Sequence, residues 1–99
     1  MIRGTTPTLE FTLPFNTNIL EEAWITFSQH NTVVLNKKLD ECESEDQKLV
    51  IKLTQAETLM LDCEYNTEIQ VRVRTKEGEA LASDIITVRT DRILKDGEI

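Results

Sequence analysis

The chain has few of the residues that most catalytic sites use. It contains one histidine, two cysteines and three glycines among 99 residues. The single histidine, His30, lies in a predicted hairpin loop where nothing fixes an imidazole, so we expect a solvated turn residue rather than a catalytic base. No glycine-rich phosphate-binding loop is present. These shortages predict a protein that is not an enzyme and that uses no cofactor.

The two cysteines, Cys42 and Cys63, lack the paired spacing of a zinc site, and only one histidine could join them. The first six residues contain no apolar signal segment. No run approaches the roughly 20 apolar residues that span a membrane. We therefore expect a chain made in the cytoplasm, with both thiols reduced. A disulfide would require a Cα separation that the sequence does not give.

Positive charge is also scarce. With 11 Lys and Arg against 18 Asp and Glu, the formal net charge is −7. Since no basic stripe is present to neutralise phosphates, nucleic acids and anionic membranes are poor candidate partners. An acidic run suggests calcium, but the spacing and the central glycine of an EF-hand are absent, so we expect a solvated loop and no metal. The run consists of Asp40, Glu41, Glu43, Glu45 and Asp46.

Alternation of apolar and polar residues is the main structural signal, and it predicts about six strands. These strands cover residues 8–13, 23–28, 33–39, 48–53, 68–75 and 83–90. The inward-facing sets are Leu9, Phe11 and Leu13; Ala23, Ile25 and Phe27; Val33, Leu35 and Leu39; Leu49, Ile51 and Leu53; and Ile69, Val71 and Val73. In the last strand, Ile86 and Val88 share one face, and Ile85 and Thr87 share the other. Among these, we expect Phe11, Phe27, Leu53 and Val71 to be buried.

A capping-box pattern interrupts the strands. The Thr54 hydroxyl can accept from the amide of Glu57, and the Glu57 carboxylate can accept from the amide of Thr54. This predicts a short helix through about Met60, pinned to the core by Leu59 and Leu61 because it is too short to stand alone. The pattern as a whole predicts one domain over residues 1–99. Its expected fold is an immunoglobulin-like antiparallel β-sandwich, with the helix between the fourth and fifth strands and an irregular segment at about 91–99.

Trp24 alternates with the inward-facing residues of its strand, so it should lie on the outer face of that strand. An exposed tryptophan favours either cover from an irregular terminal segment of the same chain or contact with another subunit. The C-terminal segment carries Ile93, Leu94 and Ile99, which have no evident place in the core. We therefore expect the Trp24 face and this tail to form a protein-contact surface, with the tail covering Trp24 in its own chain or in a neighbour.

Several segments together resemble a known group of proteins. They are residues 3–15 (RGTTPTLEFTLPF), 23–29 (AWITFSQ), 52–58 (KLTQAET), 80–86 (ALASDII) and 92–97 (RILKDG). The chain resembles small uncharacterised phage and prophage proteins of Gram-positive bacteria, a group similar to the Ig-like N-terminal domain of phage baseplate upper proteins. The resemblance implies a virion-associated or tail-assembly role and carries no catalytic residues.

The leading hypothesis is therefore a non-catalytic structural or interaction module, a phage tail or baseplate-associated protein that is incorporated in a virion. Its partners would be protein, either itself or other phage tail proteins. The alternative is a free-standing bacterial adaptor that binds a protein or peptide at a sheet edge.

Overall fold

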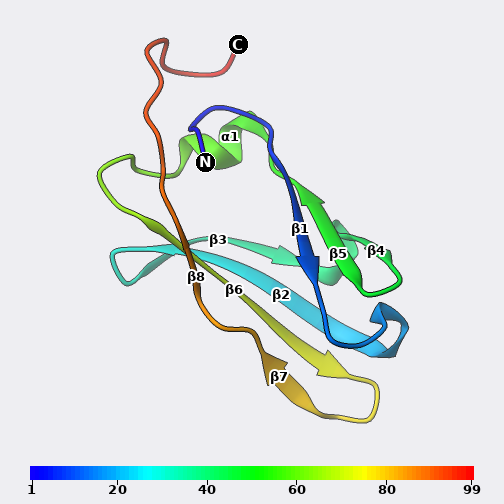
Figure 1. Ribbon diagram of the computed structural model, residues 1–99. Coiled ribbons are helices and arrows are strands. Elements are labelled where there is room, and N and C mark those ends of the chain that lie inside the picture. The colour runs from blue at the N-terminus through cyan, green and yellow to red at the C-terminus, as the bar shows by residue number, and fades with distance from the viewer.

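The computed structural model describes all 99 residues, and the chain is mostly β-structure. Eight strands, one short α-helix and two 3-10 turns follow one another along the chain (Figure 1). They are β1 (Thr8–Thr12), η1 (Thr17–Ile19), β2 (Leu20–Gln29), β3 (Thr32–Lys38), η2 (Leu39–Glu41), β4 (Glu43–Glu45), β5 (Lys48–Lys52), α1 (Gln55–Leu59), β6 (Thr67–Thr75), β7 (Ala80–Ala82) and β8 (Ile86–Val88).

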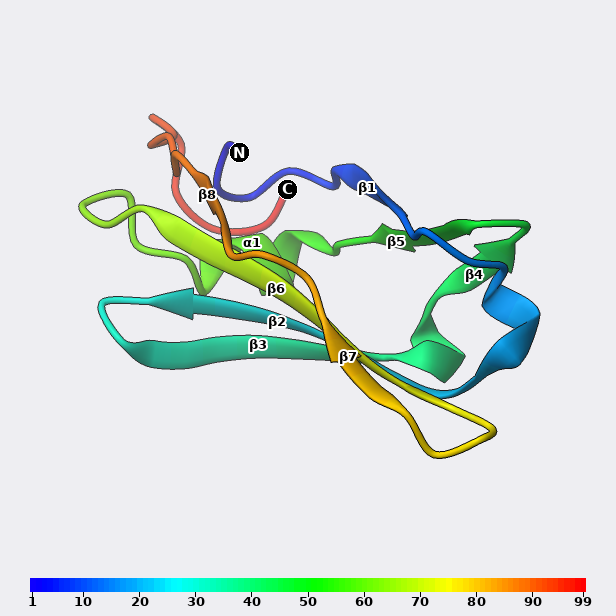
Figure 2. The same ribbon diagram turned by 60° about the horizontal axis from the view of Figure 1, so that its bottom comes forward.

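The strands form two antiparallel sheets that lie face to face (Figure 2). The smaller sheet has the order β1-β5-β4. The larger sheet has the order β3-β2-β6-β7. Strand β7 pairs with residues 72–74 of β6, and β8 pairs with residues 67–69 of the same strand. The expectation of an all-β, sandwich-type protein is confirmed. The expected number of about six strands is too low, because the sequence pattern misses three-residue strands.

The core lies between the sheets and is built from the predicted inward sets of β2, β5 and β6. Phe27, Leu53 and Val71 are buried as expected, with at most 3% of each side chain exposed. Phe11 packs against the core but is only half-buried, which corrects the expectation that it is buried. Its strand is an edge of the smaller sheet, so one flank of the ring stays open to solvent.

The hairpin of β2 and β3 turns through two residues, His30 and Asn31, which both have positive φ angles (49° and 61°). Such turns match the right-handed twist of paired strands. The register then shifts: Leu35 lies opposite Phe27, but Val33 lies opposite Ser28. This bulge reverses the alternation, and Val33 is 57% exposed rather than inward-facing.

Helix α1 confirms the capping box. The Thr54 hydroxyl accepts from the Glu57 amide at 3.1 Å, and the Glu57 carboxylate accepts from the Thr54 amide at 2.9 Å. Leu61, just beyond the helix, is buried as expected, whereas Leu59 is half-buried. Directly before Leu59, the fully buried Thr58 donates to the carbonyl of Thr5 at 2.8 Å. This short helix lies between β5 of the smaller sheet and β6 of the larger one.

Two segments differ from the sequence expectation. Residues 40–46, expected as a loop, contain the end of η2 and the edge strand β4, whose three residues are all exposed. The strand predicted over 83–90 is shorter, because only β8 (Ile86–Val88) lies within it, and the three-residue strand β7 (Ala80–Ala82) precedes it. Between β7 and β8, the Ser83 hydroxyl accepts from the amide of Val71 at 3.0 Å. This side-chain bond interrupts the backbone ladder, and the alternation of apolar and polar residues does not reveal it.

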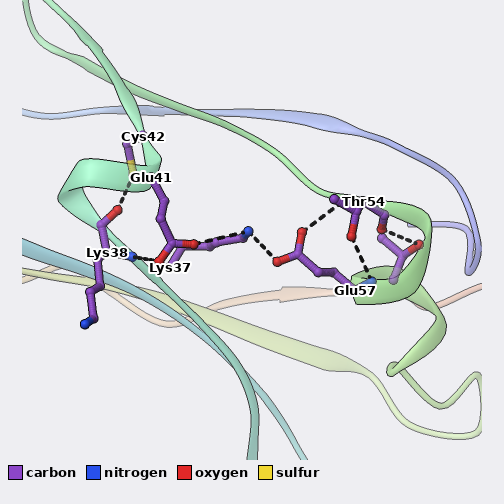
Figure 3. Close-up of polar contacts among 7 residues, drawn as sticks. Lys37, Lys38, Glu41, Cys42, Thr54 and Glu57 are labelled. Carbon is purple, nitrogen blue, oxygen red and sulfur yellow. Dashed lines mark hydrogen bonds and ion pairs between the residues drawn. The ribbon is translucent and has the colours of Figure 1, made fainter.

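Lys37 faces the interior of the sandwich, where only 12% of its side chain is exposed. Its ammonium forms an ion pair with Glu57 of α1 and a second with Glu41 at 3.4 Å (Figure 3). Burial alone would lower the pKa of Lys37, but the two carboxylates outweigh it and raise that pKa. Burial would likewise raise the pKa of Glu57, but Lys37 and the Thr54 amide lower it. The pair therefore fastens β3 to α1.

Candidate functional site

Trp24 lies on the outer face of the larger sheet, as its parity predicts. It belongs to β2, whose neighbours are β3 on one side and β6 on the other. Residues directly opposite in antiparallel strands share a face. Lys38 of β3 and Arg72 of β6 are those residues, so the indole has a cation on each flank.

The indole is held by its neighbours in the same sheet. Its Nε1 donates to a carboxylate oxygen of Glu22 at 2.8 Å. The Lys38 ammonium lies 5.2 Å from the ring centroid, within range of a cation–π interaction worth about 0.5–1 kcal/mol at exposed sites. The ring is half-buried. Its orientation is therefore fixed before any partner arrives, which reduces the entropy lost on binding.

An open groove of about 580 Å³ surrounds the indole on this face. Five of its eight lining residues are polar or charged, unlike the largely apolar clefts that enclose small molecules. This composition is closer to that of a protein-contact surface than to that of an active-site cavity. The lining residues are Glu22, Trp24, Thr26, Asn36, Arg72, Val73, Arg74 and Ala80. We call this region the Trp24 groove, and we include with it Lys38, which lies over the ring.

The charges of the groove are unevenly paired. Arg74 lies 3.3 Å from Glu22 and 3.7 Å from Glu21, so its charge is compensated. Neither the Lys38 ammonium nor the Arg72 guanidinium has a carboxylate oxygen within 4.0 Å. In a chain with seven more acids than bases, the two cations beside the single tryptophan are thus free to bind an external anion.

The C-terminal tail lies elsewhere. It runs beside the N-terminus and α1 (Figures 1 and 2), and both backbone groups of Ile99 hydrogen bond to the Gln55 side chain at 2.8 and 3.2 Å. Ile93 is half-buried, whereas Leu94 is 92% and Ile99 94% exposed. No tail residue lines the Trp24 groove. The structure therefore does not bring the tail onto Trp24 of the same chain, and that part of the sequence expectation is wrong.

Other candidate residues are dispersed. His30 is not simply solvated, because its ring stacks on Tyr65 with 4.7 Å between centroids. Cys42 and Cys63 are both free thiols. Burial, with Glu41 nearby, raises the pKa of Cys42.

A second exposed apolar feature follows the β7–β8 edge of the larger sheet. Leu81, Ile85 and Ile86 are 43%, 56% and 47% exposed there. Edge strands that lack charge are templates for pairing with another chain. The only charged residue between Ala80 and Val88 is Asp84, so this edge has the character that strand addition requires.

Sequence reasoning identified Trp24 but missed Lys38 and Arg72. Their place beside the indole follows from strand register, which the β2–β3 bulge alters. The alternation of Arg72 with inward valines does indicate an outward position, but the sequence does not say which residue it faces.

Comparison of the chain with protein-family models, with curated proteins and with solved structures finds no match. None of its helices is long and apolar enough to cross a membrane.

Proposed function

We propose that this protein is a non-catalytic interaction module that binds a protein partner through the Trp24 groove. The observation that carries the proposal is the half-buried indole of Trp24, held on an outer sheet face between Lys38 and Arg72 without cover from either terminus. Tryptophan and arginine are the residues most enriched where binding energy concentrates in protein interfaces. A preoriented indole with a polar rim has the composition of such a site.

We further propose that the sandwich is immunoglobulin-like and that the module belongs to a phage tail or baseplate. The crossing from one sheet to the other through α1, between β5 and β6, supports the first part. The resemblance of residues 3–15, 23–29 and 52–58 to phage and prophage proteins supports the second. In this proposal the chain is made in the cytoplasm and incorporated in the virion by protein contacts.

The test is incorporation into particles. Phage particles are produced in cells that express the tagged chain, purified by density gradient and analysed by quantitative mass spectrometry. The native chain is expected at a fixed ratio to the tail proteins. Trp24→Ala is expected to reduce that ratio at least tenfold, since truncation of a central tryptophan costs about 2 kcal/mol or more of binding. The matched control is Met60→Ala, which truncates a 55% exposed apolar side chain outside the groove.

Two outcomes would contradict the proposal. Absence of the native chain from purified particles removes the virion role. Equal incorporation of Trp24→Ala and Met60→Ala removes the groove from the contact.

A second candidate function is a free-standing adaptor that binds a peptide at a sheet edge, favoured by the exposed Leu81, Ile85 and Ile86. Its discriminating variant is Ile86→Lys, because an outward lysine on an edge strand blocks strand addition. If binding to a partner is lost with Ile86→Lys and retained with Trp24→Ala, the adaptor function replaces binding through the Trp24 groove as the proposal.

A further inference from the structure

We infer that the partner presents an acidic, extended peptide segment to the Trp24 groove, with carboxylates on either side of an apolar side chain that covers the indole. This inference rests on the proposed function and deepens it by naming the chemistry of the partner. It follows from two cations without an ion pair that lie on either side of the indole.

Two cations lie in register on either side of the indole. Lys38, Trp24 and Arg72 occupy opposing positions on the adjacent strands β3, β2 and β6. Adjacent strands are about 4.8 Å apart, so the two cationic residues are separated by roughly 10 Å of sheet, with the indole between them. An extended chain laid across the strands can place carboxylates at such a spacing with an apolar side chain between them.

The charges within the groove do not balance. Its one lining carboxylate, Glu22, already accepts from the indole Nε1 and pairs with Arg74. Arg72 and Lys38 have no such partner and are both exposed. A guanidinium binds a carboxylate through two parallel hydrogen bonds, and a lysine ammonium retains donors for a carboxylate while it lies over an aromatic ring.

The groove suits an acidic peptide better than a nucleic acid. Aromatic and cationic side chains together also suit single-stranded nucleic acid. Here the groove offers two uncompensated cations in a chain of net charge −7, so a continuous phosphate backbone would be repelled beyond the groove. A short acidic segment places its negative charges only where the two cations lie.

The experiment is selection from a random twelve-residue peptide library displayed on beads, with the folded full chain as target. Because the chain carries net charge −7, non-specific selection enriches basic peptides. We expect the opposite: sequences enriched in Asp and Glu around an apolar or aromatic residue. The same selection with the Lys38→Gln/Arg72→Gln double variant as target should not enrich them.

Affinity is then measured through the fluorescence of Trp24, the single tryptophan of the chain, using the most enriched acidic peptide. Arg72→Gln is expected to weaken binding about tenfold, because it removes one hydrogen-bonded charge contact. Arg92→Gln, which removes another exposed arginine without an ion pair, should change it less than twofold. Both sites are on the surface, where substitutions leave folding nearly unchanged.

The outcomes separate this inference from the proposed function. If the enriched peptides are neutral or basic and their binding depends on Trp24, the inference of an acidic partner is overturned, and the groove remains the contact surface. Peptides unaffected by Trp24→Ala, or no enriched peptide at all, would contradict both. A single-stranded oligonucleotide that binds the groove more tightly than the best peptide would overturn the acidic-peptide assignment.

Discussion

The Lys37–Glu57 pair should contribute more stability than any exposed ion pair of this protein. Its side chains are 12% and 18% exposed, respectively. Exposed pairs contribute about 0.2–1 kcal/mol, whereas removal of one partner from a fully buried pair costs about 3–5 kcal/mol. Since Glu41 stays beside Lys37 at 3.4 Å, we expect Glu57→Gln to lower the free energy of unfolding by about 2 kcal/mol.

The substitution isolates charge from capping. A glutamine carbonyl at position 57 can still accept from the Thr54 amide, as the carboxylate does at 2.9 Å. A double-mutant cycle with Lys37→Met, measured by urea denaturation at pH 7, gives the coupling energy of the pair. We expect about 1–2 kcal/mol. The matched control is the Lys48–Glu10 pair, 4.0 Å apart with side chains 52% and 59% exposed, which should couple by less than about 0.5 kcal/mol.

The pH dependence of the coupling follows from the two pKa directions. The pKa of Lys37 is raised above its ordinary 10.5, so its contribution is complete below pH 10.5 and is lost as pH rises through the folded value. The pKa of Glu57 is lowered below its ordinary 4.5, so its contribution is complete above pH 4.5 and is lost as pH falls through the folded value. A coupling energy no larger than that of the control pair at pH 7 would refute this reasoning.

Four further outcomes concern the fold. Phe27→Ala should lower the free energy of unfolding by about 3–5 kcal/mol, because the ring is fully buried; a variant as stable as the parent would refute the register of β2. Thr54→Ala should lose about 1 kcal/mol through the uncapped helix, read from the denaturation midpoint. Gly4→Ala should destabilise the fold measurably, since a Cβ would lie 3.0 Å from a tail carbon at a φ of 73°. Deletion of residues 92–99 should leave Trp24 emission unchanged, because the tail lies beside α1; a red shift would show that it covers the indole.

Much of the core could be predicted from alternation alone. Ile25, Phe27 and Val71 lie in strands with neighbours on both sides, where one face is fixed by burial and period-2 parity holds along the strand. The capping box at Thr54 was predictable for a similar reason, since both of its hydrogen bonds are local in sequence. Edge strands gave less reliable predictions, as the half-buried Phe11 shows.

The bulge in the β2–β3 hairpin marks the limit of this reasoning. If the pairing of Ser28 with Val33 continued without it, Trp24 would lie opposite Lys37. The extra residue moves Lys38 opposite Trp24 instead and turns Lys37 into the interior. One irregularity of backbone pairing thus sets both the interior ion pair and the cation beside the indole. Bulges depend on non-local packing, which a single sequence does not reveal.

The remaining differences also have physical causes. Strand β4 is acidic and fully exposed, so it lacks the apolar alternation that identifies strands. The tail was expected over Trp24 because both are apolar and outside the core pattern. Its place was set instead by contacts that composition does not show: hydrogen bonds to Gln55, and Ile93 near Gly4.

Site-specific photo-crosslinking during particle assembly tests the central claim most directly. A photoreactive phenylalanine analogue is placed at position 36, which lines the Trp24 groove, in one variant and at position 86, on the β8 edge, in another. We predict a discrete adduct with a structural protein of the particle from position 36 and none from position 86. An adduct from position 86 alone would contradict the claim that the Trp24 groove is the contact surface.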